Sequence, residues 1–199
     1  TDIPGMVKSV TLPASQIDRA LVNGVWFDGS SIEGFARISE SDMFLIPDLE
    51  TFAVLPWGDP VYRTARLLCD VHTPDGGLFM GSPRAVLKAT LQRAAEIGFT
   101  YQVAPELEFF LVPVDGDGQP ILGQTLDGAG YFGAATDDTT PTWQDIISAL
   151  EELGIGVESE HHEVAPGQHQ IDLRAADALT MADRVVTVTY VVRALARRN

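Results

Sequence analysis

Acidic and amide side chains gather in two short stretches of this sequence. The first contains Glu106 and Glu108, which stand two positions apart within a run rich in large apolar residues. Residues two apart on an extended strand point to the same face of a sheet. Both carboxylates are therefore expected on one face, where they repel each other unless a cation lies between them. The two glutamates could be solvated carboxylates on an exposed strand, which is the usual position of Glu. The apolar neighbours instead favour a central strand, in which burying two unpaired carboxylates would cost several kcal/mol.

The second stretch is predicted to form a hairpin, because Ala-Pro-Gly at residues 165–167 makes a turn between two extended arms. Glu158 and Glu163 lie on the first arm, and Gln170 lies on the second. Alternation along the second arm lets Gln170 face the same site as Glu163. An oxygen-rich set of this kind suits a hard divalent cation, Mg²⁺ or Mn²⁺.

Three histidines in the same stretch offer a rival zinc site. His161, His162 and His169 lie close to Glu163 in the sequence, and imidazole and carboxylate groups both bind zinc. Adjacent histidines on a strand point to opposite faces, so at most one of His161 and His162 can join Glu163 without a bulge. The spacing therefore favours the oxygen-bound divalent ion over zinc.

Several short motifs occur in a characteristic order along nearly the whole chain. They are Phe27-Asp28-Gly29-Ser30-Ser31-Ile32, Ser41-Asp42-Met43, Pro47-Asp48, Pro105-Glu106-Leu107-Glu108-Phe109-Phe110 and His161-His162-Glu163. Together they resemble glutamine synthetase, a family that ligates glutamate to ammonia with ATP and Mg²⁺ or Mn²⁺. The resemblance covers only the first half of that family, so the chain resembles a fragment, and the isolated chain is expected to be inactive.

The resemblance implies a role for each candidate residue. Glu108 and Glu163 resemble ligands of a first metal ion, and Gln170 stands where the family has a third glutamate ligand. Glu106 resembles a ligand of a second ion, which bridges the phosphates of ATP. Glu158 is implied to lie near the nucleotide.

Asp28 is the implied catalytic residue. Taken alone, an Asp before Gly is most often a turn cap. By resemblance, Asp28 reaches into the site of a neighbouring subunit, binds ammonium and draws a proton from it. The implied reaction transfers a phosphoryl group from ATP to the glutamate γ-carboxylate, and ammonia then attacks γ-glutamyl phosphate in a site that excludes water. Such a shared site implies that the full-length protein is a ring-shaped homo-oligomer, expected to be a dodecamer.

Three positions depart from the family pattern. Gln170 replaces a glutamate, Gly133 stands where an aspartate is often found, and Thr189 occupies a commonly basic position. A related enzyme that uses a polyamine or another amine would share all the motifs. The missing charge at Gln170 also leaves open a protein of another class, a metal-binding or regulatory assembly homologue without catalysis.

Composition limits the partners and the compartment. Lys and Arg number 13 against 28 Asp and Glu, a net charge of −15, which argues against nucleic acid or an anionic membrane surface as a partner. The single Cys69 cannot form an internal disulfide and fits a reducing, cytoplasmic location. No apolar run approaches the roughly 18 residues that span a bilayer.

The resemblance implies an α+β fold in two domains. Residues 1–75 are expected to form a small β-grasp-like N-terminal domain whose start is missing. Residues 76–199 are expected to form the first, truncated part of a glutamine synthetase-type catalytic α/β domain with a curved antiparallel sheet. The division is placed at the turn-rich residues 73–77.

Residue patterns predict the individual elements. Helices are expected from Pro13 to Ala20, between Ser82 and Gly98, and over 142–153. β-branched residues at 185–192 favour a strand, but an apolar face without internal Gly or Pro favours one long helix over 175–199. Strands are expected at 6–12, 43–47, 52–55, 66–71 and 101–112.

Overall fold

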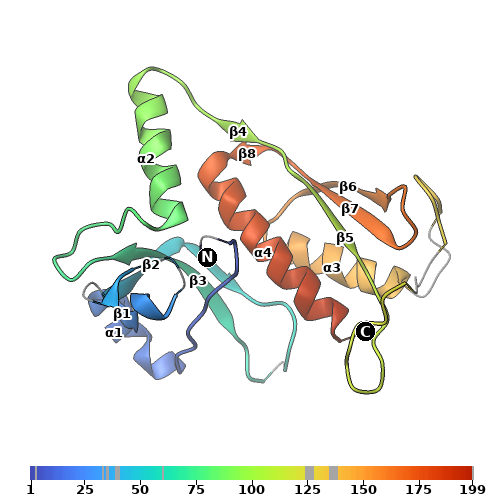
Figure 1. The fold of residues 1–199 in the computed structure, drawn as a ribbon, viewed down its shortest axis with the longest axis horizontal. Coiled ribbons are helices and arrows are strands. Elements are labelled where there is room, and N and C mark those ends of the chain that lie inside the picture. The colour runs from blue at the N-terminus through green and yellow to red at the C-terminus, as the bar shows by residue number, and fades with distance from the viewer. Residues whose placement is uncertain are drawn as a thin grey trace. The chain divides into compact units, whose positions relative to one another are not determined.

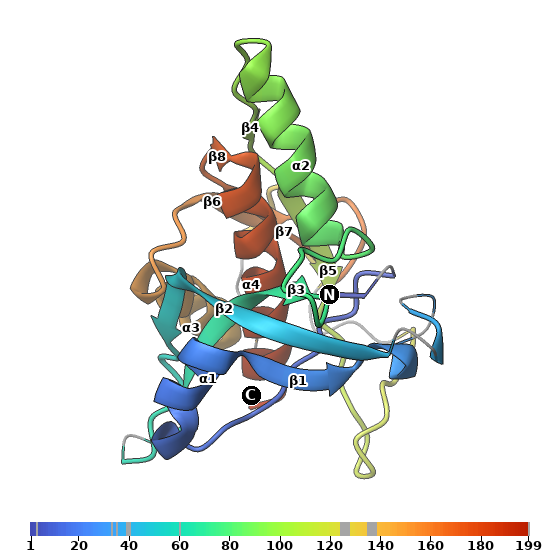
Figure 2. The ribbon, with the colours of Figure 1, turned by 90° about the vertical axis from the view of Figure 1, so that its left-hand side faces the viewer.

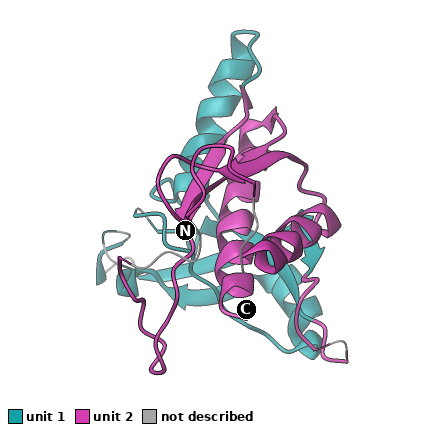
Figure 3. Cartoon of the chain, turned by 90° about the vertical axis from the view of Figure 1, so that its right-hand side faces the viewer, with its two compact units in different colours: residues 1–54, 64–101 teal, residues 55–63, 102–199 magenta. Residues whose placement is uncertain are grey.

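The computed structural model describes residues 1–2, 4–32, 34, 36–38, 41–59, 61–123, 128–134 and 139–198. The chain forms two compact units, drawn in two colours in Figure 3. Unit 1 comprises residues 1–54 and 64–101, and unit 2 comprises residues 55–63 and 102–199. Each unit contains a hydrophobic cluster of its own.

Unit 1 is built on an antiparallel sheet in the order β1-β2-β3 (Figure 2). The central strand β2 pairs with β1 so that Asp28 lies opposite Asp42. Met43 and Val71 are buried at the centre of this unit, one on each of the paired strands β2 and β3. The strands are β1 (Val25–Asp28), β2 (Asp42–Val54) and β3 (Ala65–His72).

The helices of unit 1 begin where the sequence signals predict, but the first one continues to Asn23, past its predicted end at Ala20. The longest, α2, starts at Pro83, which has no N–H to lose at the first helical position. It ends just before Gly98, whose φ of +86° suits glycine. The helical segments are η1 (Ala14–Gln16), α1 (Ile17–Asn23), η2 (Gly29–Ser31) and α2 (Pro83–Glu96).

Charged side chains hold α2 on the sheet of unit 1. Arg84 donates hydrogen bonds to Asp70 of β3 at 2.5 Å and to Asp48 of β2 at 2.7 Å. Lys88, one turn further along α2, donates to Asp70 at 2.5 Å. The helix is therefore tied to two strands through the four side chains of this ion-pair network.

Unit 2 packs two helices on one face of a three-stranded antiparallel sheet in the order β5-β7-β6 (Figure 1). A short antiparallel pair, β4 with β8, leads into this sheet and into the last helix. The elements are β4 (Gln102–Val103), β5 (Glu106–Phe110), α3 (Thr140–Glu152), β6 (Val157–His162), β7 (Gln168–Leu173), β8 (Ala176–Asp177) and α4 (Ala178–Ala196).

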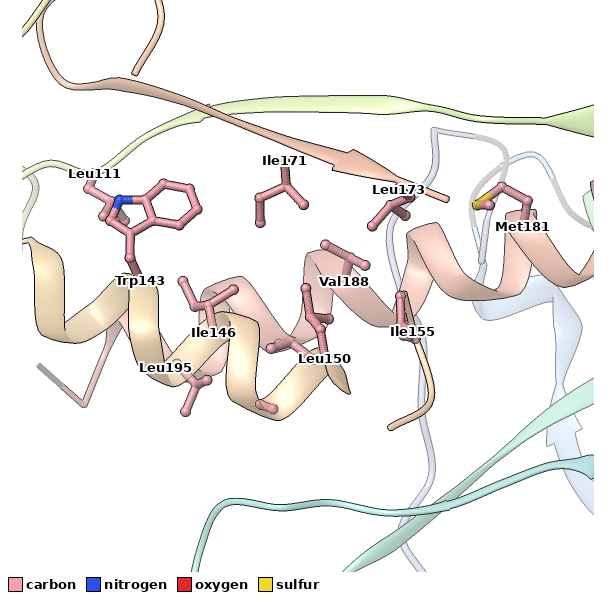
Figure 4. Packing of buried hydrophobic residues seen from close by; sticks show 12 residues of the cluster. Leu111, Trp143, Ile146, Leu150, Ile155, Ile171, Leu173, Met181, Val188 and Leu195 are labelled. Atoms are coloured by element: carbon pink, nitrogen blue, oxygen red, sulfur yellow. The ribbon is translucent and has the colours of Figure 1, made fainter. Parts of the chain in front are cut away.

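The core of unit 2 lies between the sheet and the helices. Figure 4 shows Ile171 and Leu173 of β7 pointing toward Ile146 and Leu150 of α3 and Val188 of α4. These five side chains are at most 1% exposed. Alternate residues of a strand point to opposite faces, so the even-numbered residues of β7 point away from this core.

Most of the predicted elements are confirmed, including the long terminal helix. Val188 and Val191 of α4 are fully buried, so packing overrides the strand propensity of the β-branched run. Residues 6–12 form no strand, and that prediction is wrong: every residue from 4 to 12 is exposed and has no strand partner. The predicted strands at 43–47 and 52–55 are one strand, β2.

The predicted strand at 101–112 is interrupted. It divides into β4 and β5 at Ala104 and Pro105, because proline has no backbone N–H for the ladder. No helix in the described stretches of the chain combines the length and the apolar character needed to cross a membrane.

Candidate functional site

Strand pairing brings the predicted oxygen donors onto one face of the sheet in unit 2. Glu106 of β5 lies opposite Asp172 of β7, and Glu108 lies opposite Gln170. On the other side of β7, His161 of β6 also lies opposite Gln170. Directly opposed residues of an antiparallel pair share a face. We call this side the polar face; its polar residues are Glu106, Glu108, Ser159, His161, Gln168, Gln170 and Asp172.

Hydrogen bonds order the amides and carboxylates of the polar face. Gln168 donates from Nε2 to Oε2 of Glu108 at 2.6 Å, and Gln170 donates from Nε2 to Oδ1 of Asp172 at 2.7 Å. The Ser159 hydroxyl donates to Oδ2 of Asp172. Partial burial opposes ionisation of Asp172, but the hydrogen bonds from Ser159 and Gln170 hold its pKa below the usual range. Asp172 is therefore a carboxylate at neutral pH.

Glu163 lies just past the end of β6, beside the polar face. Its backbone N–H donates to the Gln168 carbonyl at 2.9 Å, and its carboxylate accepts from the backbone N–H of Val164 at 2.9 Å. His161 lies between two carboxylates, with Nδ1 at 3.9 Å from Oε1 of Glu163 and Nε2 at 4.0 Å from Oδ2 of Asp172. The structure thus brings Glu163 next to the donors of β7.

Glu158 occupies a β-bulge in β6. Val157 pairs with Leu173 and Ser159 pairs with Asp172, so Glu158 is the extra residue between two adjacent partners. The bulge changes the parity of the strand: Val157 packs against the core, whereas Ser159 lies on the polar face. Glu158 is exposed, and its role near a nucleotide stays a prediction.

The predicted central position of the glutamate pair is wrong within the described residues. β5 lies at an edge of the sheet, and Glu106 and Glu108 are exposed. Because the two carboxylates are exposed, they do not need a cation to compensate for burial. The support for a cation is the alignment of oxygen donors on the polar face. Among the described residues, no three Asp, Glu, His or Cys side chains converge closely enough to hold an ion. An ion on this face needs further ligands or a rearrangement of side chains.

The rival zinc site is also wrong, because the three imidazoles do not converge. His162 and His169 point to the core side of the sheet, with ring centroids 4.5 Å apart and exposures of 2% and 0%. His169 lies 4.7 Å from the Trp143 ring. His161 alone lies on the polar face with Glu163 nearby, as strand alternation predicts.

Asp28 is fixed by its own loop in unit 1. Its carboxylate accepts hydrogen bonds from the Ser30 hydroxyl at 2.6 Å, the Ser30 N–H at 2.9 Å and the Ser31 hydroxyl at 3.0 Å. These hydrogen bonds hold the pKa of Asp28 below its usual range, and the bond from the Ser30 hydroxyl has the largest effect. Gly29 must be small, since a Cβ there would lie 2.7 Å from the Met43 sulfur. Asp28 is thus a turn cap, and its part in a shared site stays a prediction.

The other two departures from the family pattern have local explanations. Gly133 donates to the Gly130 carbonyl at 2.7 Å in a tight turn, and a Cβ at 133 would lie 2.8 Å from that oxygen. Thr189 donates to the Val185 carbonyl within α4 at 3.0 Å. Thr189 lines a groove of about 360 Å³ between β5 and α4, and Arg193 supplies a positive charge to the same groove.

Sequence reasoning identified Gln170 and Glu163 on this site but gave no role to Gln168 or Asp172. Their places follow from the register of β5 with β7, which puts them opposite Phe110 and Glu106. The parity of residues 168, 170 and 172 was the available signal, since it sets them all on one face.

Comparisons with known proteins agree along the whole chain. Residues 1–74 match the family model for the glutamine synthetase beta-Grasp domain, and residues 80–199 match the model for the glutamine synthetase catalytic domain. The chain is 48% identical over 201 residues to glutamine synthetases of Staphylococcus epidermidis and Staphylococcus aureus, covering 100% of this chain and 45% of each relative. It therefore spans about half the length of the curated relatives it matches.

Solved structures show the same fold. A GmaS protein in an ADP complex superposes with a TM-score of 0.85 at 32% identity, covering 100% of this chain and 45% of that chain. Plasmodium falciparum glutamine synthetase, solved by cryo-electron microscopy, gives a TM-score of 0.76 at 24% identity over 94% of this chain and 41% of that chain, which shows the fold alone. The expected α+β fold with a β-grasp part and a catalytic part is confirmed. On both family models and on these relatives, the chain belongs to the glutamine synthetase family.

Proposed function

We propose that the complete protein ligates ammonia to the γ-carboxylate of L-glutamate with ATP, through γ-glutamyl phosphate. The observation that carries this proposal is the alignment of Glu106, Glu108 and Gln170 on one sheet face, with Glu163 beside it. This alignment occurs in a chain 48% identical to glutamine synthetases along its whole length.

The donor types of the polar face suit Mg²⁺ or Mn²⁺, because they are carboxylate and amide oxygens, which hard divalent cations prefer. Further ligands or a rearrangement of these side chains would complete the coordination. Glu108, Glu163 and the carbonyl oxygen of Gln170 would hold one ion, and Glu106 would hold a second. Ions bound there would neutralise charge on the ATP phosphates and on the substrate carboxylate. Glu158, which the bulge leaves exposed, would contact the nucleotide.

Asp28 would bind and deprotonate the amine substrate. Its carboxylate is ionised and held by the serines of its own loop, so it can attract ammonium. Its second proposed role is to accept a proton from the bound ammonium. In this proposal Asp28 acts in the site of a neighbouring subunit, and the complete protein is a ring-shaped homo-oligomer, expected to be a dodecamer. Its place is the cytoplasm, where ATP, glutamate and ammonia are available.

A second candidate keeps the chemistry and changes the amine. GmaS, a gamma-glutamylmethylamide synthetase, resembles this chain at 32% identity and a TM-score of 0.85. This likeness favours a γ-glutamyl-amine or polyamine synthetase as the alternative. The neutral Gln170 favours a third possibility of another class, a metal-binding or regulatory assembly homologue without catalysis.

The test is amine-dependent ADP formation by the complete protein with glutamate and Mg²⁺ or Mn²⁺. Ammonia, methylamine, ethylamine and a polyamine are compared by kcat/KM. Ammonia is expected to give the highest value; a higher value for another amine would assign the second candidate. Mn²⁺ binding without ADP formation for any amine would assign the non-catalytic class. An Asp28→Asn variant should raise the KM for ammonium and lower kcat.

A further inference from the structure

The side-chain amide of Gln170 is held in one orientation. The residue is 6% exposed, and Nε2 donates to Oδ1 of Asp172 at 2.7 Å. Within the described part of the chain, no donor reaches the carbonyl oxygen of this amide. One end of a nearly buried amide is thus satisfied, and the other end is available to a ligand.

The identity of the available end follows from the chemistry of the partner. An ionised carboxylate accepts hydrogen bonds and donates none, whereas a primary amide has a donating and an accepting end. Asp172 therefore selects the orientation that turns the NH₂ group toward it and the oxygen away from it. A metal ion can bind only the oxygen end.

Asp172 is itself held in place on both sides. Its Oδ1 accepts from Gln170, and its Oδ2 accepts from the Ser159 hydroxyl. Both carboxylate oxygens are therefore engaged within the sheet. The amide oxygen of Gln170 is then the oxygen of this pair that accepts no hydrogen bond from the described residues, and residue 170 lies opposite Glu108 in the β5–β7 register.

We propose that Asp172 is a positioning residue, which orients Gln170 so that its carbonyl oxygen takes the ligand position of a divalent cation. This inference rests on the proposed function, because it assumes that an ion binds at the polar face. The Asp172–Gln170 pair allows a neutral side chain to present an oxygen at a position where the family pattern has a glutamate.

The test is a double-mutant cycle on Mn²⁺ affinity in the complete protein, measured by electron paramagnetic resonance of free Mn²⁺ without nucleotide. The variants are Asp172→Asn, Gln170→Glu and the combination of both. Asp172→Asn preserves shape but can offer either amide end to Gln170, so it should weaken Mn²⁺ binding about ten-fold. With Glu at 170 there is no amide to orient, and the same change should not weaken binding.

A matched control is Glu152→Gln, which removes one negative charge from an exposed position in the same unit. It should leave Mn²⁺ affinity unchanged. Equal weakening by Asp172→Asn in both backgrounds would overturn the inference, since Asp172 would then act by its charge or as a direct ligand. No weakening in the wild-type background would overturn it as well. If the wild-type protein binds no Mn²⁺ at millimolar concentration, the proposed function itself fails.

Discussion

Replacing Arg84 with Met should destabilise unit 1 by about 2–3 kcal/mol. The side chains of Arg84, Asp70 and Asp48 are 13%, 16% and 23% exposed, respectively. Removing one partner of a buried ion pair costs about 3–5 kcal/mol, because a charge is left uncompensated. The expected loss is smaller here because Asp70 keeps Lys88 and because Asp48 is partly accessible to water.

Lys88→Met is the matched control. Lys88 is 31% exposed and contacts only Asp70 of the two aspartates, which would keep Arg84. Its replacement should cost no more than about 1 kcal/mol. Met retains apolar contacts of the aliphatic stem in both variants, so the comparison isolates the charged groups.

Urea unfolding, monitored by circular dichroism, measures the free energy of unfolding. Hydrogen exchange over residues 83–96 measures the local opening of α2. The free energy of unfolding contributed by this network should also depend on pH. Burial opposes ionisation of Asp70, but hydrogen bonds from Lys88 and Arg84 hold its pKa below the usual value. This contribution is present above the unfolded pKa of about 4 and is lost as the pH falls through the lower folded pKa.

Wild-type protein should therefore lose more stability on acidification than Arg84→Met. Equal stability of Arg84→Met and wild type at pH 7, with the same acid dependence, would refute the role of the network. A loss of stability without faster exchange in α2 would show that the network does not hold this helix on the sheet.

Three other expectations concern the site and the single thiol. Gln170→Glu should tighten Mn²⁺ binding about ten-fold, and Glu163→Gln should weaken it. Calorimetry measures both affinities. If Gln170→Glu leaves the affinity unchanged while Glu163→Gln abolishes binding, residue 170 does not reach the ion. Burial, and then the charge of Asp70, raise the pKa of Cys69 to about 11, so a thiol reagent at pH 8 should label it only on unfolding; rapid labelling of folded protein would contradict this. Because Asp28 is proposed to serve a neighbouring subunit, the complete protein should sediment as a ring-sized oligomer, and a fully active monomer would rule out the shared site.

Strand alternation predicted much of the site, because the two-residue period of a strand is strict. It let Gln170 face the same site as Glu163, and it allowed only one of His161 and His162 to join Glu163. The bulge at Glu158 was not predictable in the same way. One extra residue changes every later side chain to the other face, and only the register with β7 reveals it.

The position of β5 in its sheet was beyond local patterns. The apolar residues beside Glu108 are compatible with a central strand, yet whether a strand lies at an edge depends on which distant segments pair with it. Pro105 was a local signal that the long predicted strand would be interrupted. For α4, the expected helix formed because the buried face contributes more than the strand propensity of its valines.

The ion-pair network bears on the proposed division between residues 75 and 76. Arg84 falls in the segment that matches the catalytic domain, whereas Asp48 and Asp70 fall in the segment that matches the beta-Grasp domain. All three lie in unit 1, which extends to residue 101. The strand that carries Asp48 also pairs with the strand that ends in Asp28. Helix α2, which lies in the segment that matches the catalytic domain, is thus attached to β2, the strand that pairs with β1 and its Asp28. A division at residue 75 would separate charges that stabilise one another.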